Sequence, residues 1–204
     1  MTSSARRTIR RDLIVWTMTA LGIAAAIAQN RAPAKPIIDN ERVTVWDITE
    51  ADGLSGHKPA GDFVVVTVTP QPGAAYHAKG SAMDPIRGRT VIIDLKDTPV
   101  APLQNTSGHP NAFPRPGATK LFENNRVIVW DYVWKPGVPS PMHFHDKDVV
   151  VGYVEDGALK STTPDGQSTV NEFKAGTTRF NPRNRVHTEV MTSPRARAII
   201  TELK

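Results

Sequence analysis

The sequence predicts an all-β fold built from two tandem β units, on three observations. Proline and glycine are frequent, at 17 and 14 of 204 residues, which favours many short strands joined by turns. Apolar residues alternate with polar ones in several short segments, as they do in half-buried strands. The same strand-like segments also occur twice in the same order. We therefore expect two related β units, preceded by an N-terminal segment of different composition.

The N-terminal segment, residues 1–28, has the composition of an export signal. The basic stretch "SARRTIRR" precedes the uncharged run "LIVWTMTALGIAAAIA", which ends with small residues at Ala26 and Ala28. As a helix this run spans about 24 Å, less than the roughly 30 Å of a bilayer core. We expect a cleaved signal helix and a periplasmic or secreted protein, with an uncleaved anchor as the alternative. A Sec-type signal is expected rather than the twin-arginine type that Arg10 and Arg11 loosely resemble.

The rest of the composition argues against nucleic-acid binding. The net charge is +5, but residues 1–28 hold four arginines and one aspartate and so account for +3 of it. A nearly neutral body with 6% aromatic residues offers no basic stripe or stacking platform. The absence of cysteine excludes thiolate ligands and cysteine nucleophiles. We expect a small-molecule ligand or substrate, no nucleic acid, no stable membrane span after signal cleavage, and leave a homodimer open.

The two copies of the repeat differ in length. From a shared aspartate to a shared arginine, the first copy spans 25 positions (62 to 87) and the second spans 47 (148 to 195). The first copy, within residues 29–96, is therefore predicted to be degenerate. Residues 97–120, rich in Pro, Asn, Ser and Gly, are the predicted linker. The matched segments are 37–49 with 121–133, 57–68 with 143–154, and 87–96 with 195–204.

The second copy contains a motif centred on two histidines. Gly137 is followed by five residues and then by His143 and His145, which lie on the same face of a strand because they are two positions apart. This pattern resembles the first motif of the cupin superfamily, whose members are small jelly-roll β-barrels. The family motif continues with a glutamate and a glycine, and those positions hold Val150 and Gly157 here. The acidic position of the family is thus apolar in this chain.

A second motif follows in the order that the family requires. Gly176, five residues, Pro182, one residue, Asn184, two residues and His187 resemble the second cupin motif. Asn184 replaces a glycine of that motif, and Met191 replaces its final asparagine. Asparagine in place of glycine is a mild change, because both residues tolerate positive φ. Both motifs of the family are therefore present, with single departures.

The resemblance covers residues 121–204 directly and residues 37–96 only through the internal repeat. It implies a bicupin with two tandem jelly-roll units: the degenerate unit at 29–96 and a C-terminal cupin domain at 121–204. It also implies a divalent metal ion, as Zn, Fe, Mn, Ni or Cu. By resemblance, the ligands are His143, His145 and His187.

The fourth ligand stays open between two carboxylates, and a site of three histidines alone is also workable. Glu189 lies two residues beyond His187, so alternation along a strand directs both side chains to the same face. Asp148 is the other candidate. Its counterpart Asp62 persists in the first copy, where Pro59 has replaced the second histidine, which favours a role for Asp148 in the turn.

Two functions are consistent with these residues. The first is an exported, metal-binding cupin that acts as an enzyme on a small polar molecule, with Glu189 and Arg185 as candidate catalytic residues. Glu189 would serve as a general base, and Arg185 would hold a carboxylate or other anionic group. The alternative is a non-catalytic cupin without metal, acting as a small-ligand-binding or structural module.

Overall fold

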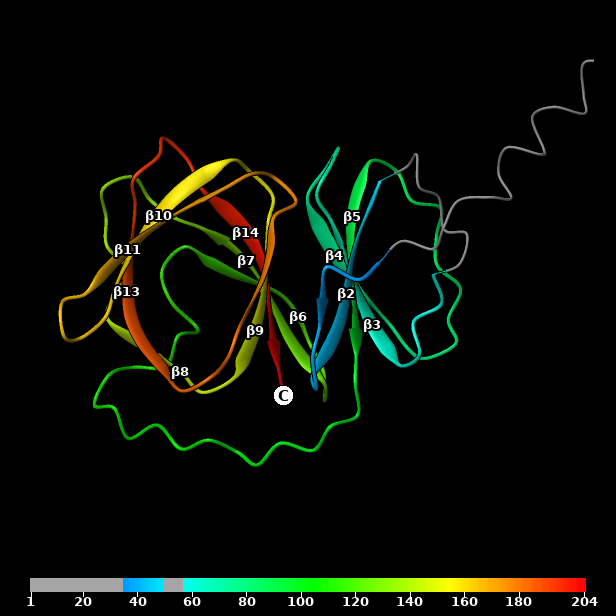
Figure 1. Ribbon diagram of the computed structural model, residues 1–204, viewed down its shortest axis with the longest axis horizontal. Helices are drawn as coiled ribbons and strands as arrows, with labels where there is room; N and C mark the ends of the chain where they lie inside the picture. Colours follow the sequence, from blue (N-terminus) through cyan, green and yellow to red (C-terminus); the bar gives the residue numbers. More distant parts are fainter. Residues whose placement is uncertain (1–34, 50–56) are drawn as a thin grey trace, which may run out of the picture. The chain divides into compact units, whose positions relative to one another are not determined.

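The computed structural model describes residues 35–49 and 57–204, and the regular structure in these ranges is entirely β (Figure 1). The predicted signal helix at residues 1–28 lies outside the described residues. Residues 35–49 and 57–204 contain no helix that is long and apolar enough to span a membrane. The all-β prediction is confirmed for this part of the chain.

The first copy of the repeat forms one antiparallel sheet of five strands, in the order β1-β2-β5-β3-β4. Its segments are rich in Val, Ile and Thr, which pack well on a pleated, half-buried surface. The strands are β1 (Ile38–Asp39), β2 (Val43–Thr49), β3 (Asp62–Thr67), β4 (Gly73–His77) and β5 (Arg89–Leu95).

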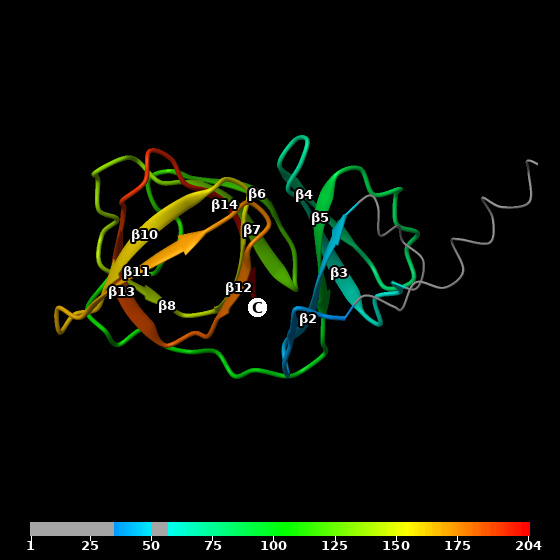
Figure 2. The ribbon, with the colours of Figure 1, turned by 45° about the horizontal axis from the view of Figure 1, so that its top comes forward.

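The second copy forms two antiparallel sheets on opposite sides of an apolar interior, which we call the barrel (Figure 2). The first has five strands in the order β12-β9-β14-β7-β6, and the second has four in the order β11-β10-β13-β8. The strands are β6 (Ala118–Glu123), β7 (Val127–Val133), β8 (His143–His145), β9 (Asp148–Tyr153), β10 (Gly157–Thr162), β11 (Ser168–Phe173), β12 (Thr178–Asn181), β13 (Arg185–Met191) and β14 (Arg197–Leu203).

The five-stranded sheets of the two copies correspond in strand order and in register. Val43 lies opposite Leu95 in the first copy, and the equivalent Val127 lies opposite Leu203 in the second. The strands β8, β10, β11 and β13 have no counterpart among residues 35–49 and 57–96. Two tandem jelly-roll barrels are therefore not confirmed, because the shorter first copy forms a single sheet in its described residues.

Alternation along the strands gives the five-stranded sheet of the barrel two apolar faces. Val127 and Val129 lie in a core shared with the valines and isoleucines of the first copy's sheet. Trp130 and Tyr132 belong instead to the interior of the barrel. The five-stranded sheet of the barrel is therefore buried on both faces. Its inner face lines the same interior as the strands that carry the histidines.

Two ion pairs connect the copies in a reciprocal way. Arg42 donates to Asp148 at 2.7 Å, and the equivalent Arg126 pairs with the equivalent Asp62 at 3.5 Å. The second oxygen of Asp148 accepts a hydrogen bond from the backbone N–H of Arg183 in the following turn. Both aspartates therefore hold the two copies together, which explains why Asp62 persists in a copy that lacks the histidine pair.

Candidate metal centre

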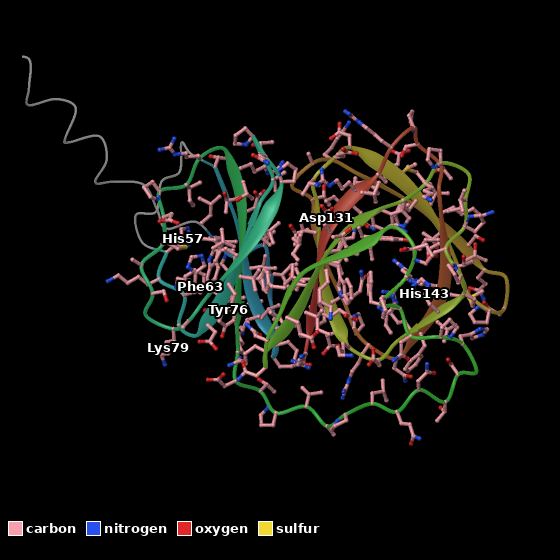
Figure 3. All side chains as sticks on the ribbon, turned by 180° about the vertical axis from the view of Figure 1, so that it is seen from behind. His57, Phe63, Tyr76, Lys79, Asp131 and His143 are labelled. Carbon is pink, nitrogen blue, oxygen red and sulfur yellow. The ribbon has the colours of Figure 1, made fainter. Side chains whose placement is uncertain are left out.

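Two neighbouring strands bring the three predicted histidines together. Strand β8 contributes His143 and His145, and its antiparallel partner β13 contributes His187. His187 lies directly opposite His143 in the register. Because side chains two positions apart share a face and paired residues point the same way, all three imidazoles face the barrel interior. Figure 3 shows His143 in the second copy, whereas His57 of the first copy packs against the ring of Trp46.

The three rings form a nearly equilateral group. Their centroids are 5.1 Å apart for His143 and His145, 4.7 Å for His143 and His187, and 5.1 Å for His145 and His187. One nitrogen from each ring lies within 4.8 Å of the other two. The Nε2 atoms of His145 and His187 are 3.2 Å apart. Two nitrogens bound to one ion at roughly 2.0–2.1 Å are about 2.9 Å apart at a right angle and about 3.3 Å apart at the tetrahedral angle. The observed spacing falls between these values.

Burial keeps the three imidazoles uncharged at neutral pH. Their exposed fractions are 1% for His143, 6% for His145 and 5% for His187. Loss of solvation lowers the pKa of His143 to about 3, that of His145 to about 2 and that of His187 to about 3. Nearby arginines act in the same direction on all three pKa values. Each ring therefore keeps a lone pair, which a metal ion needs.

The hydrogen bonds of the rings fit a metal-binding arrangement. The Nδ1 of His143 lies 2.7 Å from the carbonyl oxygen of Pro141, so it carries the proton and leaves the Nε2 lone pair free to accept. The facing Nε2 atoms of His145 and His187 share one proton, which an ion bound by both nitrogens would replace. The Nδ1 of His145 is buried without a hydrogen-bond partner. The donor set suits a divalent metal.

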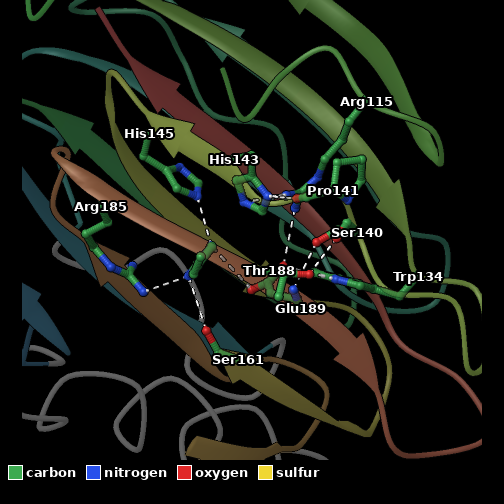
Figure 4. A network of polar contacts seen from close by, with 11 residues as sticks. Arg115, Trp134, Ser140, Pro141, His143, His145, Ser161, Arg185, Thr188 and Glu189 are labelled. Carbon is green, nitrogen blue, oxygen red and sulfur yellow. Dashed lines mark hydrogen bonds and ion pairs between the residues drawn. The ribbon is translucent and has the colours of Figure 1, made fainter. Parts of the chain in front are cut away.

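Glu189 lies beside His187, although, like Asp148, it does not belong to the histidine group itself; Figure 4 shows it with its partners Arg115 and Trp134. Its Oε1 is 3.9 Å from the Nε2 of His187. Its Oε2 accepts hydrogen bonds from the indole N–H of Trp134 at 3.1 Å and from Arg115 at 3.3 Å. One oxygen of the carboxylate is therefore held in place while the other faces the histidines.

The structure places Asp148 and Val150 away from the histidines. Both oxygens of Asp148 are used by Arg42 and the Arg183 backbone, and Asp148 does not belong to the histidine group. Val150 lies in the core between the two five-stranded sheets. Its neighbours Val149 and Val151 face the barrel. A glutamate at position 150 would therefore be directed away from the site, so the apolar residue there removes no ligand.

The turns of the two motifs adopt the conformations that their residues favour. Gly137 has φ of 66° and Gly176 has φ of 85°, both in the left-handed region. Asn184 also has a positive φ, of 64°. Among the described residues it is the only non-glycine residue with a positive φ. The expectation that asparagine replaces glycine in this turn without changing its conformation is confirmed.

Other side chains at the site are the predicted Arg185, which lies within the second motif, and three residues that lie outside both motifs. Arg185 has an Nη2 atom 3.3 Å from the Nδ1 of His187, and the hydroxyl of Ser161 lies 3.2 Å from the same nitrogen. Arg115 belongs to the predicted linker and Trp134 follows β7, so neither falls in a motif. No spacing signal in the sequence could have identified these residues.

Comparisons with known proteins were made by sequence and by structure. No family model matches the chain, and no curated protein does. A cupin domain from Bordetella pertussis Tohama I is 30% identical, with 45% of this chain and 97% of that chain covered and a TM-score of 0.41. A cupin-2 domain-containing protein from Shewanella frigidimarina is 20% identical, with 45% and 83% covered and a TM-score of 0.35. A cupin superfamily protein from Desulfitobacterium hafniense is 15% identical, with 42% and 74% covered and a TM-score of 0.35.

The identity to the Bordetella domain extends over nearly the whole length of that domain. The two histidine motifs converge on one buried group. The chain is similar to these cupin-domain structures.

Proposed function

We propose that the C-terminal cupin domain binds a divalent metal ion through His143, His145 and His187, with Glu189 as the fourth ligand. The observation that supports this most directly is the 3.2 Å separation of two uncharged Nε2 atoms on neighbouring strands. The position of Glu189 supports its assignment, since one oxygen is anchored by Trp134 and the other faces His187.

The ligand set narrows the choice of metal only partly. Three imidazoles and one carboxylate suit Zn, Ni and Cu at least as well as Fe and Mn. When bound, the ion supplies Lewis-acid chemistry to a small polar molecule. Arg185 lies beside His187 and provides a positive charge for an anionic group of that molecule. Glu189 would take part in proton transfer only in a state in which its Oε1, which faces His187, is not bound to the ion.

Metal analysis of the purified protein tests the proposal. After supplementation with the ion and removal of excess, we expect about one equivalent of metal per chain. His143→Ala and His187→Ala should each lose most of it, whereas Asp156→Asn, at an exposed residue outside the histidine group, should retain it. Less than about a tenth of an equivalent in the unmutated protein would reject metal binding.

One observation favours the alternative function, a cupin that binds a small molecule without metal. The guanidinium of Arg115 lies 2.6 Å from the Nε2 of His143, which is the nitrogen that a metal would use. If this alternative holds, the unmutated protein and both His→Ala variants contain no metal. They would still weaken binding of a small anion to the barrel.

We also propose that the first copy derives from a complete cupin unit, so that the chain is a degenerate bicupin. The matching strand order and register of the two five-stranded sheets support this. Export remains a proposal as well, supported by the composition of residues 1–28. It predicts a mature N-terminus near Gln29, which N-terminal sequencing of the protein from its native host would test.

A further inference from the structure

A segment of the predicted linker runs along the outer edge of β8. We call residues 110–117 the strap. The N–H of Ala112 donates to the carbonyl of Phe144, and the N–H of Phe144 donates to the carbonyl of Pro110, both at 2.8 Å. Asn111 and Phe144 form a parallel bridge. Strand β8 therefore pairs with β13 on one side and with the strap on the other, so the strap is fixed next to the histidines.

The strap places one charged side chain inside the barrel. The guanidinium of Arg115 lies over the rings of Phe113 and Tyr132, at 4.7 and 4.2 Å from the ring centroids to Cζ. Its side chain is 6% exposed. Its Nη1 is 2.6 Å from the Nε2 and 3.0 Å from the Nδ1 of His143, and its Nη2 is 3.3 Å from Glu189 (Figure 4). A buried arginine thus contacts two of the proposed ligands at once.

Arg115 opposes a metal ion at His143 by its charge and its position. The Nδ1 of His143 donates its proton to Pro141, so Nε2 has the single lone pair of the ring. The Nη1 of Arg115 lies 2.6 Å from Nε2 and 3.0 Å from Nδ1, so the guanidinium packs against the ring beside the nitrogen that a metal would use. Its fixed positive charge opposes a cation at that place.

Glu189 offers Arg115 a second position. The Nε of Arg115 is buried without a hydrogen-bond partner, so its contacts beside His143 are incomplete. Glu189 already lies within 3.3 Å of Nη2, and a carboxylate can accept two parallel hydrogen bonds from a guanidinium. A small rotation of the side chain would exchange the contact with His143 for a fuller one with Glu189.

We propose that Arg115 is a gate whose buried positive charge, packed against His143, lowers the metal affinity of the site. The gate rests on the proposed function, since it has meaning only for a site that takes a metal. Binding of the ion requires that Arg115 leave His143. The strap, rather than the histidines alone, then determines how tightly the ion is held.

Arg115→Met tests the gate. Methionine keeps an unbranched apolar stem against Phe113 and Tyr132 but has neither the charge nor the donors. We expect Co²⁺ and Zn²⁺ to bind at least about tenfold more tightly than in the unmutated protein, a change equivalent to about 1.4 kcal/mol. The dissociation constants are measured at fixed pH by competition with a chromophoric chelator. Arg115→Lys, which keeps the charge, should give a smaller change.

Arg179→Met is the matched control. Arg179 belongs to β12 of the same barrel, bonds to Asn171 and has no recorded contact with a histidine of the site. Its substitution should leave the dissociation constants within about twofold. Thermal unfolding of each variant verifies that it is folded.

The outcomes separate the gate from the metal site itself. Metal binding by the unmutated protein, with binding by Arg115→Met that is at least about tenfold tighter, supports the gate. Equal or weaker binding by a folded Arg115→Met overturns the gate but leaves the metal site standing. Absence of metal from every folded variant rejects both proposals.

Discussion

At the scale of single residues, one or two hydrogen-bond partners fix the orientation of each buried polar side chain at the site. His143 uses one ring nitrogen to donate to Pro141 and keeps the other as an acceptor. Glu189 has one oxygen fixed by Trp134. Such partners orient a ligand and set the direction of its lone pair, so their loss reduces metal affinity even though they do not touch the ion.

Trp134→Phe should therefore weaken metal binding. The variant keeps most of the aromatic volume and removes the N–H that holds the Oε2 of Glu189. We expect a dissociation constant for Zn²⁺ about tenfold higher, within the range found for partners of metal ligands. Chelator competition measures the constant. Retention of the original affinity would show that the hydrogen bond from Trp134 does not orient a metal ligand.

The buried carboxylate of Glu202 gives a prediction about pH. Its Oε2 accepts a hydrogen bond from the indole N–H of Trp130 at 2.7 Å, and burial raises its pKa above the usual 4.5. The folded state therefore binds the proton more tightly than the unfolded state does. The protonated carboxyl of Glu202 therefore adds to the free energy of unfolding. This contribution is complete below pH 4.5 and is lost as the pH rises through the folded-state pKa.

Glu202→Gln should remove the loss of stability that ionisation of the buried carboxyl causes at neutral pH. The amide oxygen still accepts from Trp130, but no charge is buried at neutral pH. We expect the free energy of unfolding at pH 7 to rise by about 1 kcal/mol, and the difference from the unmutated protein to shrink toward pH 4. Urea unfolding at both pH values measures it. A variant that is less stable at pH 7 would mean that the ionised carboxylate is stabilising.

At the scale of elements, the turn before β13 sets the direction in which that strand enters the barrel. Asn184 adopts the left-handed conformation, and its N–H donates to the carbonyl of His145 at 2.8 Å. The turn thus connects β13 to β8 at the end where the histidines lie. Its conformation decides whether Arg185 and His187 share the register that brings the three rings together.

Asn184→Ala should destabilise the protein, whereas Asn184→Gly should not. A Cβ in the left-handed region costs about 1–2 kcal/mol, and alanine lacks the short polar side chain by which asparagine offsets part of this cost through local hydrogen bonds. Glycine adopts this region freely. Thermal unfolding compares the two variants. Equal melting temperatures would indicate that the turn adjusts its backbone without cost.

At the scale of the whole described unit, the reciprocal ion pairs between the copies differ in environment. Arg42 and Asp148 have side chains that are 7% and 10% exposed and lie 2.7 Å apart. Arg126 and Asp62 are 24% and 22% exposed and lie 3.5 Å apart. Loss of one partner leaves a buried charge in the first pair but a solvated one in the second, so the equivalent substitutions should differ in effect.

Arg42→Ala should cost about 3–5 kcal/mol, the usual penalty for an unpaired buried charge. Arg126→Ala should cost about 1 kcal/mol or less from the ion pair. The double variant Arg42→Ala/Asp148→Asn should recover part of the first loss, because it leaves no unpaired charge. Denaturant unfolding measures all three. Equal losses from the two single variants would contradict the difference in burial.

Much of the fold could be predicted from local features. Alternation and β-branched residues predict the strands, and the repeat predicts the shared sheet. The spacing of Gly137, His143, His145 and His187 predicts the metal site, because a strand directs residues two apart to one face. These features depend on neighbours in the chain, so the sequence determined the all-β class, the two related units and the three histidines.

The tertiary structure alone decided the surroundings of that site. Arg115 contacts His143 across 28 positions of the chain, and Trp134 reaches Glu189 across 55. The outward direction of Val150, the single sheet of the first copy and the Arg42–Asp148 pair also depend on how strands pair and pack. Periodicity and spacing describe the local backbone. Contacts between distant segments follow from the register and packing of whole sheets, and those were fixed only in the folded structure.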